Sequence, residues 1–108
     1  MTIFVAECAG VVIGYVYAGV EPRSWKELRE VAGFIHDVVV DPDARRSGVG
    51  TRLIEAAAAW LATRGIARVM LWTAEQNQEA QRLFERLGFR RTMIEMTREC
   101  LVATTDER

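Results

Sequence analysis

The residues best suited to chemistry are Arg45-Arg46-Ser47-Gly48-Val49-Gly50. Two glycines two positions apart let the backbone turn tightly and approach a ligand closely. An apolar stretch with helical spacing follows, so the free N–H groups and positive dipole end of a helix would meet there. This arrangement binds anions such as a diphosphate, and the arginines add positive charge. The alternative is a plain glycine turn beside a solvated arginine corner.

Two other phosphate-binding patterns do not fit this segment. A P-loop needs a lysine directly after its second glycine, and no lysine lies near Gly48 or Gly50. A dinucleotide fingerprint needs a third glycine three positions later, where Leu53 stands. The segment therefore indicates an anion site of another kind.

The elements that must position this segment begin with β-rich runs. Thr2–Cys8 and Val11–Ala18 flank Ala9-Gly10 and predict an antiparallel hairpin. Residues 19–33 predict a loop, which could hold a short helical turn at Trp25–Val31.

The central part predicts a strand, a helix and a second strand. Phe34–Val40 is almost continuously apolar, which is typical of a strand covered on both faces, and Asp41-Pro42-Asp43 ends it. An apolar stripe predicts a helix over Gly50–Arg64 that stops at Gly65. Val69–Thr73 predicts a parallel strand, because a crossover helix separates it from the first.

The remaining elements complete a single α/β domain, residues 1–108, with one mixed sheet. Asn77 is expected to cap a helix that ends at Gly88. Phe89–Met96 predicts a final strand, and Thr104–Arg108 a frayed tail. The apolar face of the capped helix is Ala80, Leu83, Phe84 and Leu87.

In order and spacing, these features resemble the GNAT superfamily of acyl-CoA-dependent N-acyltransferases over roughly residues 3–97. Arg45, Gly48 and Gly50 hold the fixed positions of its signature, [QR]-x-x-G-x-[GA]. Val38-Val39-Val40-Asp41-Pro42 looks like its strand lead-in. Its second motif looks like Asn77-x-x-Ala80-x-x-Leu83-Phe84-Glu85-Arg86-Leu87-Gly88-Phe89.

The resemblance implies an N-acetyltransferase that moves an acetyl group from acetyl-CoA to a primary amine by direct attack in a ternary complex. One alternative is a catalytically weak or inactive module that binds acyl-CoA. A third reading is a purely structural dimerising domain.

The resemblance also implies where coenzyme A lies. Its pantetheine arm would fill a gap between Val38–Val40 and Leu71–Thr73, and its pyrophosphate would meet the amides of Arg46–Thr51. Asn77 would contact the cofactor, although it could equally act only as a helix cap. The cofactor-binding residues implied are Val38, Val39, Val40, Arg45, Arg46, Ser47, Gly48, Val49, Gly50, Thr51 and Asn77.

Catalysis in such a site needs an oxyanion donor and a base. The backbone N–H of Val40 is expected to be the donor. His36 is expected on the strand face of Val38 and Val40, and its imidazole suits a general base near neutral pH; a local hydrogen bond is the alternative. Asp37 would face the other way in a structural role. Glu75 could orient the ammonium group or relay a proton.

Two features depart from the family pattern. Phe84 stands where many members have a tyrosine that protonates the leaving thiolate, so water, Tyr15 or Tyr17 would have to replace it. The usual opening strand and two helices are also absent. The apolar faces of the hairpin would then be exposed, and a homodimer is expected to cover them.

The composition of the chain limits the kinds of partner that are expected. The net charge is −1 with both signs scattered, which offers no argument for nucleic acid or an anionic membrane as partner. No apolar stretch is long enough to span a bilayer, and a cytoplasmic protein is expected. Cys8 and Cys100 are expected as half-buried thiols, without a disulfide or metal site. The acceptor is expected to be a small-molecule or peptide amine, and the loop of residues 19–33, with Arg23, Trp25 and Lys26, is expected to border its site.

Overall fold

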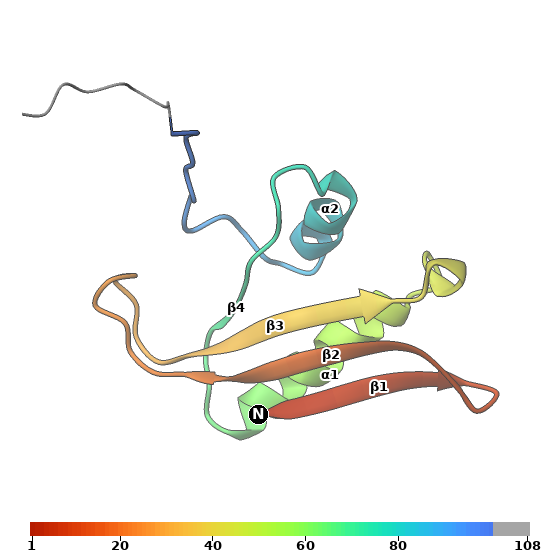
Figure 1. Cartoon of the computed structure of the whole chain (residues 1–108). Coiled ribbons are helices and arrows are strands. Elements are labelled where there is room, and N and C mark those ends of the chain that lie inside the picture. Colours follow the sequence, from red (N-terminus) through yellow and green to blue (C-terminus); the bar gives the residue numbers. More distant parts are fainter. Residues whose placement is uncertain (101–108) are drawn as a thin grey trace, which may run out of the picture.

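The computed structural model describes residues 1–100; the predicted tail Thr104–Arg108 lies outside this part. The described chain forms one four-stranded sheet with helices (Figure 1). The strands are β1 (Thr2–Cys8), β2 (Val11–Glu21), β3 (Ala32–Val40) and β4 (Val69–Leu71). The helices are the 3-10 helix η1 (Pro42–Ala44) and the α-helices α1 (Val49–Thr63) and α2 (Gln78–Arg86).

The sheet order β1-β2-β3-β4 confirms the mixed topology. β1 and β2 pair antiparallel across a turn whose Ala9 and Gly10 both have positive φ, the conformation that a tight hairpin requires. β2 and β3 are antiparallel, whereas β3 and β4 are parallel and joined through α1. The predicted hairpin and the strand–helix–strand unit are therefore confirmed.

The core lies between α1 and one face of the sheet. Ile54 and Ala57 of α1 pack against Val16 of β2 and Ile35 of β3, and Phe84 of α2 completes the cluster. The predicted stripe is confirmed, because the buried residues of α1 are Leu53, Ile54, Ala57 and Leu61.

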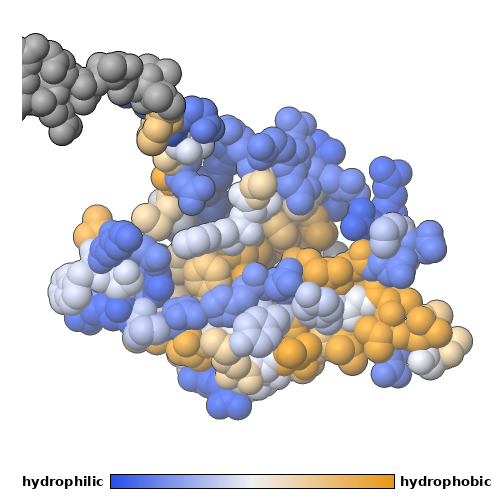
Figure 2. All heavy atoms as spheres, viewed as in Figure 1, coloured by the Kyte–Doolittle hydropathy of each residue, from blue (hydrophilic) through white to orange (hydrophobic). Residues whose placement is uncertain are grey.

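The opposite face of the sheet carries no covering element in residues 1–100. Phe4 and Ala6 of β1 pack toward the core, whereas the alternating Ile3 and Val5 are 58% and 53% exposed. Figure 2 views the sheet from this side and shows apolar residues gathering near the β1–β2 turn. The predicted exposure of the hairpin is confirmed.

The connection between β2 and β3 differs from expectation. The predicted helical turn at Trp25–Val31 is wrong: β2 runs on to Glu21, and residues 22–31 form a short hairpin-like turn. Ser24 and Arg29 exchange two backbone hydrogen bonds of 3.0 Å, which pair the arms of the turn instead of coiling them.

The predicted final strand Phe89–Met96 is also wrong, because residues 90–100 have no regular structure. Gly88 has φ +94, and the Phe89 N–H donates to the Phe84 carbonyl at 3.0 Å, so the chain ends α2 in a Schellman turn. β4 is only three residues long and offers no edge on which eight residues could pair.

Other expectations concern the cysteines, metals and membranes. Cys8 and Cys100 are free and exposed rather than half-buried. Among the described residues, no group of three or more metal-ligating side chains could hold a metal ion. No helix in the same part is long and apolar enough to cross a membrane.

Candidate functional site

Strands β3 and β4 separate toward their carboxyl ends. Their pairing covers only Gly33–Ile35 against Val69–Leu71, whereas β3 continues to Val40. The Asp41 N–H donates to the Ile13 carbonyl on the β2 side at 2.7 Å. Because N–H directions alternate along a strand, the amides of Val38 and Val40 face the splayed edge. The splay expected from the family resemblance is therefore present.

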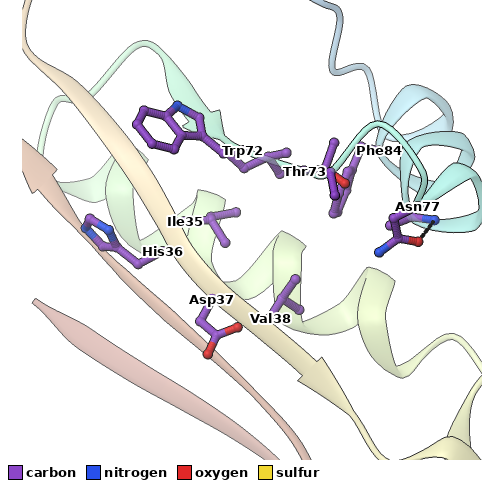
Figure 3. A pocket seen from close by; sticks show the side chains of 11 residues that line it. Ile35, His36, Asp37, Val38, Trp72, Thr73, Asn77 and Phe84 are labelled. Carbon is purple, nitrogen blue, oxygen red and sulfur yellow. Dashed lines mark hydrogen bonds between the residues drawn. The ribbon is translucent and has the colours of Figure 1, made fainter. Parts of the chain in front are cut away.

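A shallow cavity of ≈ 230 Å³ opens at this splay (Figure 3). β3, β4 and α2 all contribute to its wall. The lining residues are Ile35, His36, Asp37, Val38, Leu71, Trp72, Thr73, Ala74, Asn77, Ala80 and Phe84.

A β-bulge sets the direction of His36. Tyr17 pairs with Asp37 and Ala18 with Ile35, so His36 is an extra residue in β3. The bulge breaks the alternation of side chains. The His36 ring lies 5.5 Å from that of Tyr17, on the open face of the sheet, whereas Val38 packs toward the core. The prediction that His36 shares a face with Val38 and Val40 is therefore wrong.

Asp37 lies on the same open face, away from Val38. The Tyr15 hydroxyl donates to Asp37 Oδ2 at 2.8 Å. This hydrogen bond, with desolvation and the negative charge of the carboxylate, raises the pKa of Tyr15 above its usual value of 10.0. The Asp37 carboxylate therefore has a defined hydrogen-bond partner, the Tyr15 hydroxyl, beside the cavity.

The Tyr15–Asp37 pair makes stability depend on alkaline pH. Folding favours protonated Tyr15, so the contribution of the pair is complete below about pH 10 and is lost as pH rises through the raised pKa. We expect Tyr15→Phe to remove this part of the alkaline loss, measured by urea unfolding between pH 9 and 11. Tyr17→Phe is the matched control, because the Tyr17 hydroxyl faces the Met1 sulfur rather than a carboxylate. If the free energy of unfolding depends equally on pH in the wild type, Tyr15→Phe and Tyr17→Phe, the alkaline loss does not come from the Tyr15–Asp37 pair.

The arginine–glycine segment lies where β3 leads through η1 into α1. Gly48 caps α1 with φ +85, and no side chain caps the helix. Within residues 1–100, the amides from Arg46 to Thr51 donate no hydrogen bond, and the first helical bond runs from the Arg52 N–H to the Gly48 carbonyl. Free amides at a helix N-terminus form an anion site. We call this segment, Arg45–Thr51, the cradle.

The two arginines of the cradle differ. Arg45 Nε donates to the Val40 carbonyl at 3.2 Å, which ties the cradle to the end of β3. Arg46 has φ +65 and a solvent-exposed side chain, with Arg46 Nε 4.0 Å from Glu79 Oε1. Arg45 thus has a positioned guanidinium, whereas Arg46 keeps an exposed charge beside the free amides.

Asn77 and Glu75 have different positions. Asn77 lines the cavity and caps α2, because its Oδ1 accepts from the Ala80 N–H at 3.2 Å. The cap leaves the side-chain NH2 group as a donor. Glu75 lines neither this cavity nor a second one beside His36, and its backbone carbonyl accepts from the Gln81 side chain at 2.8 Å. Of the predicted site residues, the cavity brings together His36, Val38 and Asn77.

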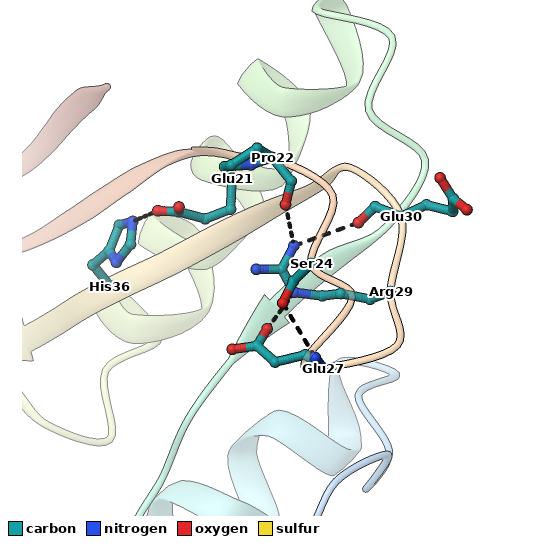
Figure 4. A network of polar contacts seen from close by, with 7 residues as sticks. All are labelled: Glu21, Pro22, Ser24, Glu27, Arg29, Glu30 and His36. Carbon is teal, nitrogen blue, oxygen red and sulfur yellow. Dashed lines mark hydrogen bonds and ion pairs between the residues drawn. The ribbon is translucent and has the colours of Figure 1, made fainter.

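The second cavity, of ≈ 340 Å³, lies on the other side of His36. His36 Nε2 lies 2.9 Å from Glu21 Oε1, and Arg29 holds the adjoining turn through Glu27 and the Pro22 carbonyl (Figure 4). Sequence reasoning missed these side chains. Their signal, a carboxylate and an arginine within a predicted loop, is too common to identify a site. The lining residues are Glu21, Glu27, Arg29, Phe34, Ile35, His36 and Trp72.

Comparisons with known proteins place this geometry in a family. An uncharacterised N-acetyltransferase of Methanocaldococcus jannaschii is 42% identical over 80% of this chain and 38% of its own length. A mycothiol acetyltransferase of Thermobispora bispora is 37% identical over 86% of this chain and 31% of its own length. The chain thus spans only about a third of the length of either relative.

Solved structures agree with these relatives. An aminoglycoside N-acetyltransferase in complex with CoA superposes with a TM-score of 0.80 at 25% identity, covering 91% of this chain and 65% of its own. The family model described as "Acetyltransferase (GNAT) family" matches residues 1–89. With the splayed strands and the cradle, these matches show that the chain belongs to the GNAT acetyltransferase family.

Proposed function

We propose that this chain transfers an acetyl group from acetyl-CoA to a primary amine, by direct attack while both substrates are bound. The observation that carries the proposal is the run of free amides from Arg46 to Thr51, at the end of the splayed strand β3. Relatives named as acetyltransferases, and a similar structure that contains CoA, support it.

The described residues offer contacts for the pyrophosphate and the pantetheine arm of coenzyme A. The amides of Arg46–Thr51 would hold the pyrophosphate, with charge from Arg45 and Arg46. The unpaired edge of Val38–Val40 would bind the pantetheine arm as an added strand would. The Asn77 NH2 group would donate to it inside the cavity. Bound acetyl-CoA supplies an activated acetyl thioester.

Residues beside the cavity supply the remaining chemistry. His36 would accept the proton of the attacking amine. The N–H of Val38 would stabilise the negative charge that develops on the thioester oxygen. Val38 replaces Val40 in this role because Val38 lines the cavity and Val40 does not. Phe84 lines the cavity without a hydroxyl, so water would protonate the thiolate.

The acceptor is proposed to be a small molecule. Relatives and similar structures are named for mycothiol and for aminoglycosides, which supports a small-molecule amine over a peptide. We also propose that a second copy of the chain covers the open sheet face, because Ile3 and Val5 are more than half exposed there. A compact monomer in sedimentation velocity, together with no binding of a hydrophobic dye, would contradict this proposed dimer.

Two measurements, made one after the other, test the proposed function. Calorimetry should show CoA binding at micromolar concentration, because the cradle is already formed. Release of free thiol from acetyl-CoA should then depend on added amine. Binding without thiol release for any amine would instead identify a module that only binds acyl-CoA. Absence of CoA binding would favour the alternative of a purely structural dimerising domain.

A further inference from the structure

The two cavities meet at shared residues. Ile35, His36 and Trp72 line both of them. Figure 3 shows His36 and Trp72 at one end of the first cavity, with Asn77 and Phe84 at the other. If the thioester occupies the first cavity, an amine that enters from the second would reach it beside His36. The second cavity is therefore placed to hold the rest of the acceptor.

The charges of the second cavity leave one carboxylate uncompensated. Arg29 Nε contacts Glu27 Oε2 at 2.5 Å, and the Arg29 side chain is only 9% exposed. The opposite charges of Arg29 and Glu27 therefore compensate each other. Glu21 is the remaining carboxylate, and within residues 1–100 its only ion-pair partner is His36. The carboxylates of Glu21 and Glu27 outnumber the single arginine in this lining, so the cavity favours a cation.

Aromatic rings add a second preference for a cation. Phe34 is 8% exposed and forms part of the cavity wall, and Trp72 meets it edge-on with ring centroids 5.6 Å apart. Trp72 itself is 69% exposed, so its ring face remains open. A tryptophan face attracts an ammonium group more strongly than any other side-chain ring does. A carboxylate and an open indole thus border the same space.

We infer that the second cavity selects acceptors with two positive charges. Glu21 and Trp72 bind the distal ammonium group while the reacting amine lies beside His36. This inference rests on the proposed acetyl transfer and adds the substrate class, aliphatic diamines and polyamines. Glu21 is then a specificity-determining residue that also positions His36.

Three probes of similar length separate charge from shape: 1,5-diaminopentane, 5-aminopentan-1-ol and 5-aminopentanoate. We expect kcat/KM for the diamine to exceed that for the amino alcohol by about tenfold, the effect of one charge-assisted contact. The amino acid should be the poorest acceptor. Calorimetric binding of each probe to the CoA-saturated protein should give the same order without any turnover.

Glu21→Gln separates recognition from positioning. We expect it to reduce the advantage of the diamine over the amino alcohol to less than about twofold. If Glu21 only positions His36, the variant slows both amines equally, which would overturn the inference. Glu30→Gln is the matched control: Glu30 lies in the turn that follows Glu21, but it pairs with Arg23 and lines neither cavity. It should retain the full preference.

The outcomes also distinguish this inference from the proposed function. Amine-dependent thiol release with equal kcat/KM for the diamine and the amino alcohol would overturn the inference and leave acetyl transfer intact. CoA binding without turnover, but with tighter binding of the diamine, would support the selective cavity and reject the enzyme. Absence of CoA binding would reject both.

Discussion

Aspartate in place of Gly48 is expected to abolish CoA binding, raising the Kd by about 100-fold or more, equivalent to about 2.7 kcal/mol. The new carboxylate would lie among the free amides of Arg46–Thr51, where it would repel the diphosphate and compete with it for the same N–H donors. A Cβ at Gly48 meets no atom within 4 Å, so the loss does not come from a steric clash. Isothermal titration calorimetry with CoA measures the change.

Gly65→Asp is the matched control at the other end of α1. Gly65 also has positive φ, +76, and a Cβ at this position would meet no atom within 4 Å, so the same residue enters the same backbone conformation. An aspartate at a helix C-terminus opposes the helix dipole, whereas one at the N-terminus complements it. Gly65→Asp should therefore be the less stable protein, yet it should bind CoA normally. Retained affinity in Gly48→Asp would mean that the diphosphate lies elsewhere.

The cradle and its supporting elements could be predicted because their signals are local. Gly48 and Gly65 mark the two ends of α1, and Asn77 caps α2, each through bonds to residues a few positions away. The apolar stripe of α1 likewise follows directly from helical spacing. The order of strand, crossover helix and strand along the chain then predicted the parallel pairing of β3 and β4.

The direction of His36 could not be predicted, because it depends on a register shift between β2 and β3. A period of two assumes a regular ladder, and one extra residue reverses it. No residue type at Tyr17 or Ala18 marks this bulge. Asp37 faces away from Val38, as predicted, and its carboxylate accepts from Tyr15; the register shift places His36 on this same open face.

The second cavity shows another limit of sequence reasoning. Glu21 ends β2, His36 lies in the middle of β3 and Trp72 follows β4, so only the fold brings these three residues together. Phe89–Met96 shows the reverse case, a β-rich run that has no partner edge. Both outcomes depend on tertiary context, which local propensity does not contain.

Asparagine in place of His36 is expected to lower kcat by about 100-fold, the lower end of what a positioned general base contributes. An asparagine amide cannot accept the proton of the attacking amine, so the loss should appear in kcat, measured by the release of free thiol from acetyl-CoA. The Kd for CoA should stay within about twofold, since His36 supplies none of the free amides proposed to hold the diphosphate.

Asp37→Asn is the matched comparison for this prediction, because Asp37 is the adjacent residue, lines the same cavity and shares the open face. If His36 is the base, Asp37→Asn keeps most of the wild-type kcat. The reverse result, a large loss of kcat at Asp37 and little change at His36, would transfer the role to the carboxylate that Tyr15 holds. The bulge in β3 makes this comparison necessary, because it leaves both side chains on the open face, beside the same cavity.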